Sequence, residues 1–185
     1  MFELDQPASW LPLEDRLEQA DRTRQRAILQ TVIDHAKAEA AGDVDGLMAT
    51  LVSEPRYHFW TPLGDVGPKG RDAVRRYYED YIAGGAAVFS APPERIVVDD
   101  ESIAYECTMT TLAPWEVARA RGYAIPEATG HYALSMRIAL FWTFDEHARA
   151  LGEDTYSAIA PDAFVRLGDG DLPPVYLDYL SAIGR

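Results

Sequence analysis

The sequence has little that would hold a protein together covalently or through a metal. Its 185 residues include a single cysteine, Cys107, which excludes an internal disulfide and a multi-cysteine zinc site. A lone thiol suits a reducing compartment, so we expect a cytoplasmic protein. The chain is long enough for one domain to bury a hydrophobic core without such supports.

Basic residues are scarce. The chain has 17 lysines and arginines against 30 aspartates and glutamates, which gives a formal net charge of -13. A surface this acidic repels a phosphate backbone, so nucleic acid is not an expected partner. The acidic residues are spread along the chain instead of forming a tail, and solubility is their simplest role.

Long apolar runs are missing as well. No stretch approaches the roughly 18 apolar residues that a membrane span needs, and the first ten residues do not resemble a signal peptide. We therefore expect no membrane partner. Phosphate loops, nucleophile elbows and dinucleotide-binding fingerprints are also absent from the sequence. Residues 168–171 resemble part of a calcium loop but lack its terminal glutamate, so we interpret them as an ordinary loop.

The first half of the chain has the periodicity of helices. Apolar residues recur at spacings of three and four over 13–41, which predicts either one helix or a short helix followed by a longer one. Gly42 is suited to end it, and Asp43 to cap a second helix. A third helix is predicted over 71–83, and a last one after Pro173.

The second half changes to the period of strands. Residues 56–61 predict an early strand, and further strands are expected over 94–98, 102–111, 130–144 and 153–160. Short connections favour an antiparallel meander. The segment 112–129 is longer than a hairpin needs, so we expect it to cover part of the molecule. Helices followed by a run of strands indicate an α+β fold.

Three segments in this order resemble the NTF2-like superfamily and, within it, the SnoaL-like group. They are the helix Ala41-Gly42-Asp43-Val44-Asp45-Gly46-Leu47-Met48, the helix start Gly70-Arg71-Asp72-Ala73-Val74 followed by Tyr77-Tyr78, and Ala128-Thr129-Gly130 before the long strand. The resemblance spans about residues 27–160. It implies a cone-shaped fold, with helices packed into a curved antiparallel sheet around a pocket, and frequent dimerisation through the sheet. We divide the chain accordingly into a helical extension (1–26), the NTF2-like domain (27–160) and a C-terminal loop and helix (161–185).

The resemblance also implies a range of functions. Members of the superfamily include ketosteroid isomerases, epoxide hydrolases, dehydratases and polyketide cyclases, together with binding proteins that have no catalysis. It therefore implies a small hydrophobic ligand and, in an enzyme, proton transfer without a cofactor. The Asp-Arg pair of the epoxide hydrolases, two residues apart on a strand, has no counterpart here. A non-catalytic binding module and a protein-interaction dimer remain as alternatives.

The early strand offers the candidate base. Alternation sends one of its two residue sets inward, either Arg56, His58 and Trp60 or the other three. We expect His58 and Trp60 to point inward, because Arg56 at the strand start can reach solvent. His58 titrates near neutrality and would serve as the general base.

Two more residues complete the expected catalytic group. Asp154, which begins the last strand together with Glu153, would orient His58 or act as the acid. Tyr78 would donate a hydrogen bond to developing negative charge. The structural alternatives are an exposed or hydrogen-bonded histidine, a turn aspartate and a core tyrosine.

Aromatic side chains are the expected lining of the pocket. We assign to it Trp60, Tyr77, Tyr81, Trp115, His131 and Trp142. The long strand leaves open which face is internal, since the alternate set from Tyr132 to Trp142 is apolar and the set from His131 is mixed. A sheet with two such faces favours a partner, so we expect a homodimer.

The remaining titratable candidates receive structural interpretations. We expect Glu106 to face solvent or a dimer partner, and Cys107 to be a small buried apolar residue. We interpret His35 and His147 as structural or solvent-exposed.

Overall fold

The fold is an eight-stranded sheet with helices on one face and a further helix at one end. The computed structural model describes residues 2–61, 64–120, 125, 127–159 and 163–185. Its helices are η1 (Pro7–Ser9), α1 (Leu11–Glu18), α2 (Thr23–Ala41), α3 (Val44–Ala49), α4 (Arg71–Ala83), α5 (Trp115–Ala120), η2 (Asp169–Asp171) and α6 (Pro174–Ala182). Its strands are β1 (His58–Thr61), β2 (Gly64–Asp65), β3 (Val88–Ser90), β4 (Pro93–Val98), β5 (Ser102–Pro114), β6 (His131–Phe144), β7 (Ala150–Ala158) and β8 (Phe164–Leu167).

The sheet is organised around the long antiparallel pair β5–β6. The strand order is β2-β1-β7-β6-β5-β3, while β4 pairs with β5 and β8 pairs with β6. Every pairing is antiparallel except that of β1 with β7. The pairing of β5 with β6 runs without a register shift from Ser102↔Thr143 to Pro114↔His131. Side chains therefore alternate strictly between the two faces of this central pair.

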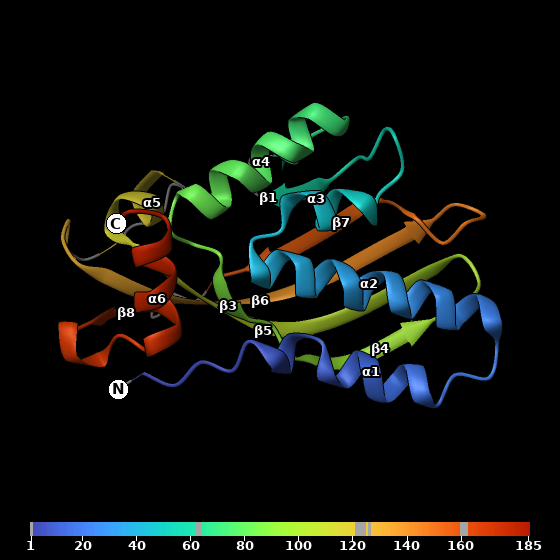
Figure 1. Ribbon diagram of the computed structural model, residues 1–185, viewed down its shortest axis with the longest axis horizontal. Helices are drawn as coiled ribbons and strands as arrows, with labels where there is room; N and C mark the ends of the chain where they lie inside the picture. The colour runs from blue at the N-terminus through green and yellow to red at the C-terminus, as the bar shows by residue number, and fades with distance from the viewer. Residues whose placement is uncertain (1, 62–63, 121–124, 126, 160–162) are drawn as a thin grey trace.

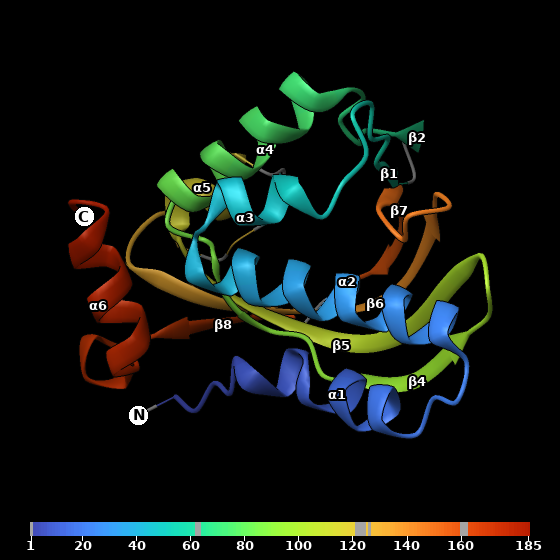
Figure 2. The same cartoon turned by 45° about the vertical axis from the view of Figure 1, so that its right-hand side comes forward.

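Helices α2, α3 and α4 cover the inner face of the sheet, and α1 lies along β4 (Figure 1). Figure 2 shows β4, β5 and β6 curving beneath them. Leu29, Leu47, Ile103 and Trp142 belong to the cluster buried between these layers. Leu112 and Ala133 are register partners whose positions alternate with the inward-facing ones, so they lie on the outer face. There they pack with Tyr176 and Leu180 of α6. The two faces are thus covered by different parts of the chain.

The predicted helix ends are confirmed by the backbone. Gly42 follows α2 with a left-handed φ of 68°, and Asp43 accepts a hydrogen bond from the amide of Gly46 at 2.9 Å. Residues 13–41 form two helices, which is one of the two alternatives that the sequence left open. The α+β architecture with helices on a curved, mostly antiparallel sheet is confirmed.

Three short strands and one pairing differ from the expectation. The sequence analysis did not predict β2, β3 or β8, which have two to four residues each and so carry too short a pattern. The early strand joins the sheet in parallel to β7, with His58↔Asp154, which a simple meander does not contain. Parts of the 112–129 segment and the end of the predicted 153–160 strand lie outside the described residues.

Gly152 allows the early strand to reach this position. It has a φ of 151°, and a Cβ added to it would lie 1.6 Å from the carbonyl oxygen of Arg56. The register of β6 and β7 shifts beside it, between Thr143 and Phe144. A side chain at Gly152 would separate β7 from the chain entering β1.

We expect Gly152→Ala to lower the free energy of unfolding by about 3 kcal/mol or more, because neither backbone can yield without breaking the sheet. Urea unfolding followed by circular dichroism measures this. Gly170→Ala is the matched control, since nothing lies within 4 Å of its added Cβ, and it should change stability by less than about 0.5 kcal/mol. Equal effects of the two substitutions would contradict this role for Gly152.

Candidate functional site

A chain of polar side chains lies between α2 and the inner face of the sheet. His35 is 2% exposed, with Nδ1 2.8 Å from Thr50 Oγ1 and Nε2 3.1 Å from the Tyr78 hydroxyl. The Thr50 hydroxyl donates to the carbonyl of Leu47 at 2.7 Å, so its oxygen accepts from Nδ1 and leaves Nε2 as the acceptor for Tyr78. Burial lowers the pKa of His35 to about 3, so the ring is neutral at physiological pH.

Tyr57 and Trp142 extend this group toward the sheet. Tyr57 is fully buried, and its hydroxyl oxygen lies 3.3 Å from that of Tyr78. The ring of Trp142 meets those of Tyr57 and His35 edge-on, at 6.2 and 4.7 Å between centroids. Burial raises the pKa of both phenols well above their usual value. The base of the interior is therefore polar, ordered and uncharged.

One carboxyl faces this interior from β7. Glu153 is the register partner of the buried Trp142, so its side chain points to the same side of the sheet. Burial raises the pKa of Glu153 from 4.5 to about 7, an effect that the hydrogen bond from the Thr155 hydroxyl reduces and the neighbouring Asp154 adds to. No residue in the described part of the chain forms an ion pair with Glu153. It is a carboxyl poised to exchange a proton near neutral pH.

Aromatic and thioether side chains form the walls around Glu153. Phe59 of β1 is the register partner of Thr155, and its ring centroid lies 5.2 Å from that of Tyr77 on α4. Tyr105 of β5 also packs against the main core from the inner face, while Met109 and Met136 do so further along β5 and β6. These inward-facing side chains keep some accessible surface, unlike Tyr57 and Trp142. These side chains therefore stay in contact with solvent.

The expectation that His58 and Trp60 point inward is wrong. Tyr57 and Phe59 take the inward positions, whereas Trp60 is 41% exposed on the outer face. The physical reason is that the set starting at Tyr57 is the more apolar one and packs on α4, while Arg56, His58 and Trp60 can all remain solvated. The difference in hydrophobicity between the two alternating sets of residues could have predicted this orientation from the sequence.

His58 and Asp154 do meet, but on the outer face. They are register partners in β1 and β7. The hydrogen bond of His58 goes instead to Asp65, with Nδ1 2.7 Å from Oδ2. Lys69 also pairs with Asp65, at 2.8 Å, and together with the amide of Gly67 and with His58 it holds the pKa of Asp65 well below its usual range. This cluster is an exposed ion-pair network, separate from the interior.

The tyrosines of α4 are divided between two environments. Tyr78 and Tyr81 are 3% and 4% exposed, so both belong to the core. Tyr78 reaches the interior through its hydrogen bond with His35, as part of the neutral network. Tyr77 keeps accessible surface and stacks on Tyr81, with ring planes 11° apart. Of the six residues assigned to the pocket, Tyr77 and Trp142 face the group around Glu153.

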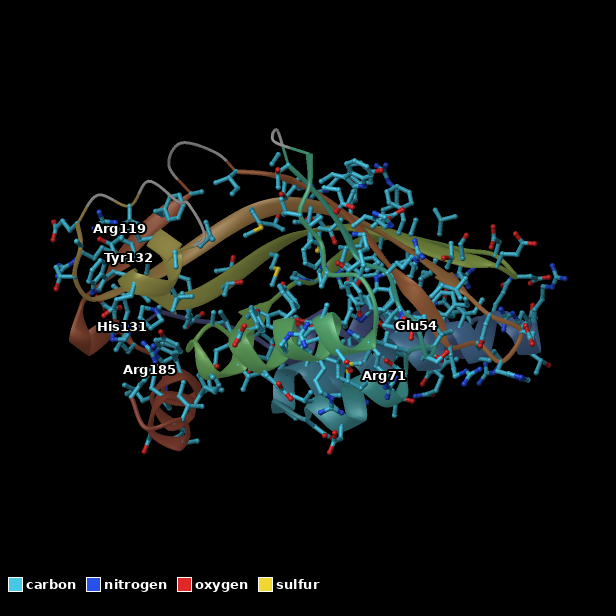
Figure 3. The ribbon with its side chains drawn as sticks, turned by 90° about the horizontal axis from the view of Figure 1, so that it is seen from above. Glu54, Arg71, Arg119, His131, Tyr132 and Arg185 are labelled. Atoms are coloured by element: carbon cyan, nitrogen blue, oxygen red, sulfur yellow. The ribbon has the colours of Figure 1, made fainter. Side chains whose placement is uncertain are left out.

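Trp115 and His131 line a different cleft, so their assignment to the central pocket is wrong. This cleft has a volume of about 390 Å³ and lies between α5, the start of β6 and α6, with Leu177, Leu180 and Arg185 in its wall. Figure 3 shows His131 and Arg185 together at this end of the molecule. His131 and Trp142 are eleven residues apart on one regular strand, so they face opposite sides and cannot share a pocket.

Other titratable groups have structural surroundings. Burial raises the pKa of Cys107 to about 12, so its thiol is not reactive. Glu106 lies on the outer face, paired with Arg95 and Arg137 at 3.3 and 3.2 Å. His147 is exposed in the turn between β6 and β7, as one of the sequence alternatives had it. In the ranges described, no three His, Cys, Asp or Glu side chains cluster as metal ligands, and no helix is long and apolar enough to cross a membrane.

Sequence comparison decides the family. Residues 32–150, well over half of the chain, match the SnoaL-like domain. The chain belongs to the SnoaL-like domain family. This SnoaL-like protein matches no curated protein by sequence. Its α1 and α6 lie outside the matched range.

Solved structures show the same NTF2-like fold. The chain is 13% identical to a putative SnoaL-like polyketide cyclase from Shewanella denitrificans OS-217, over 71% of this chain and 90% of that one, with a TM-score of 0.56. An NTF2-like protein of unknown function from Burkholderia pseudomallei K96243 is 16% identical, with coverages of 86% and 98% and a TM-score of 0.52. A Mycobacterium tuberculosis protein solved in complex with estradiol-17β-hemisuccinate is 13% identical, with coverages of 75% and 98% and a TM-score of 0.54.

The raised pKa of Glu153 predicts a pH-dependent stability. A carboxyl with a pKa of 4.5 when unfolded and about 7 when folded binds more protons in the native state, so stability falls as pH rises from 4.5 and is lowest above 7. Glu153→Gln removes this penalty. We expect the variant to gain up to about 3 kcal/mol relative to the wild type between pH 4.5 and pH 8.

Urea unfolding at pH 5, 6, 7 and 8 measures the difference. Asp154→Asn, one residue along and on the outer face, is the control: its stability should still fall as pH rises, slightly less than in the wild type because the charge of Asp154 adds to the raised pKa of Glu153. Parallel profiles for the wild type and Glu153→Gln would show that Glu153 ionises normally.

Proposed function

We propose that this SnoaL-like protein binds a small hydrophobic molecule in the concave interior and exchanges a proton with it through Glu153. The observation that carries this proposal is a carboxyl with a pKa of about 7, without a basic partner among the described residues, facing aromatic walls. Such a group is available at neutral pH both as a base and as an acid. Isomerisation, cyclisation, dehydration and hydration all fit this chemistry and need no cofactor.

Tyr105 is the proposed hydrogen-bond donor for this step. It lies on the inner face of β5, and Glu153 contributes to raising its pKa well above the usual value. Within the described residues its hydroxyl has no hydrogen-bond partner. A neutral phenol near the carboxyl is able to donate to an oxygen that gains negative charge as the proton leaves.

The relatives support a hydrophobic ligand. One structural neighbour is named as a polyketide cyclase and another was solved with an estradiol derivative. A third is a computationally designed binder of 17-OHP, with a TM-score of 0.54. These neighbours support a small hydrophobic ligand for this protein.

The test is proton exchange into ketosteroids, epoxides and polyketide-like enones in deuterated water, followed by mass spectrometry. A substrate found in this panel should lose turnover by about 10²–10⁴-fold in Glu153→Gln. Asp154→Asn and His58→Ala, both changed on the outer face, should retain turnover. Full activity of Glu153→Gln with loss in His58→Ala would reverse the assignment, and binding without exchange would favour the non-catalytic alternative.

We also propose that the outer face of the sheet forms a homodimer. Trp60, Phe141 and Tyr156 are 41%, 49% and 48% exposed there. Tyr156 stacks on Trp60, with centroids 6.2 Å apart, and meets Phe141 edge-on at 5.9 Å. A second copy would remove this continuous aromatic strip from water.

Sedimentation equilibrium at micromolar concentration should give about twice the chain mass of 20.6 kDa. Phe141→Arg places a charge in the strip and should give the monomer mass. Leu11→Arg, at a residue 47% exposed on α1, is the control and should remain dimeric. A monomeric wild type would end the dimer proposal.

A further inference from the structure

The charged groups around the interior tyrosines all have one sign. Glu153 and Glu39 are the charged side chains that act on the phenols of Tyr57, Tyr78 and Tyr105, and each raises their pKa values. No lysine or arginine of the described residues contributes to these three groups. The charges that act most on these three phenols are therefore negative, although Arg137 acts on the neighbouring Cys107.

Two other carboxylates of the described residues are paired with cations. Asp65 pairs with Lys69 at 2.8 Å, and Asp145 pairs with Arg149 at 2.8 Å. Glu153 has instead only the Thr155 hydroxyl. A half-buried carboxyl that ionises without a cation is unfavourable, and a ligand that supplied the cation would remove that penalty.

The walls next to Glu153 suit a cation as well. Phe59 and Tyr77 are in ring contact at 5.2 Å between centroids, and both keep accessible surface. Tyr105 faces the same interior from β5. Aromatic faces attract a positive charge through their quadrupole, most strongly when water is excluded. Apolar walls and an unneutralised carboxyl thus occur together.

We propose that the ligand of this site is a lipophilic cation, such as an apolar molecule carrying a protonated or quaternary amine. This inference rests on the proposed function, since it concerns the same interior and the same Glu153. An anionic ligand would be repelled by ionised Glu153. A neutral ligand would desolvate Glu153 further without compensating its charge.

The two ligand classes differ in the sign of their pH dependence. A cation stabilises ionised Glu153, so its affinity rises as pH increases through 7, whereas a neutral ligand favours the protonated carboxyl and binds more weakly as pH increases. His35 remains neutral over this range because its pKa is about 3. Within the described residues, the other titratable or polar groups that face Glu153 or adjoin it are Glu39 of α2, Tyr57, Tyr77 and Tyr78 of α4, Tyr105 and Cys107 of β5, and Asp154 and Thr155 of β7.

The experiment compares benzyltrimethylammonium with neopentylbenzene, its neutral carbon isostere, by NMR titration of the full chain at pH 6 and pH 8. We expect benzyltrimethylammonium to bind more tightly than the isostere at pH 8. Its affinity should rise by up to about tenfold from pH 6 to pH 8, following the ionised fraction of Glu153. Glu153→Gln should abolish this rise, while Asp154→Asn should retain it.

The outcomes separate the two proposals. Tighter binding of neopentylbenzene, weakening from pH 6 to pH 8 in a Glu153-dependent manner, would overturn the cation inference and leave the proposed function intact. The proposed function would also be overturned if neither probe changed the NMR chemical shifts of Phe59, Tyr77 and Tyr105 and if Glu153→Gln left all probe-induced shifts unchanged. That result would overturn the cation inference as well. Asp154→Asn removes the same charge from β7 as Glu153→Gln, so it shows whether an effect is specific to Glu153.

Discussion

The alternation of side chains across an unbroken β5–β6 pair is the constraint on which the rest of the molecule depends. The pairing has no register shift between Ser102↔Thr143 and Pro114↔His131. The position of each paired residue along its strand therefore fixes the face of the sheet on which its side chain lies. Trp142 is thereby internal and His131 external. Glu153 points inward as well, because it is the register partner of Trp142. Two residues that look equally suited to a pocket end on opposite sides of the sheet.

Desolvation then gives similar carboxyls different chemistry. Asp65 lies at an exposed edge with Lys69, a backbone amide and His58 around it, and its pKa falls. Glu153 lies among aromatic rings without such partners, and its pKa rises to about 7. Neither value follows from residue type, since both side chains ionise at similar pH in water. The difference arises from the partners of each carboxyl, and it is the basis for proposing Glu153 and not Asp65 as the proton-exchanging group.

The parts of the chain outside the family match extend the shared fold in two directions. Leu13 of α1 belongs to the main core, packed with residues of α2 and the sheet. Helix α6 instead covers the outer face at the start of β6, through Tyr176 and Leu180. That placement creates the cleft lined by His131 and Arg185, and it leaves the aromatic strip around Trp60 uncovered. The C-terminal helix thus divides the outer face into a covered end and an exposed one.

The sequence by itself determined the architecture and the family. Helical periodicity, the Gly42-Asp43 boundary and the long alternating strands are local patterns. Each can be identified within a short stretch of sequence, without knowing which segments it packs against. They led correctly to helices on a curved sheet and to the SnoaL-like group. They also brought Glu153 and Asp154 to attention as adjacent carboxyls at the start of the last long strand.

Only the tertiary structure decided which residues face the interior. The sequence analysis chose Asp154 over Glu153 and His58 over Tyr57, each one position from the residue that faces inward. A shift of one residue reverses the face of a strand, and the register that fixes it depends on partners far away in the sequence, such as Trp142 for Glu153. The pKa of about 7 arises from the same distant contacts, since burial is a property of the assembled core and not of the chain.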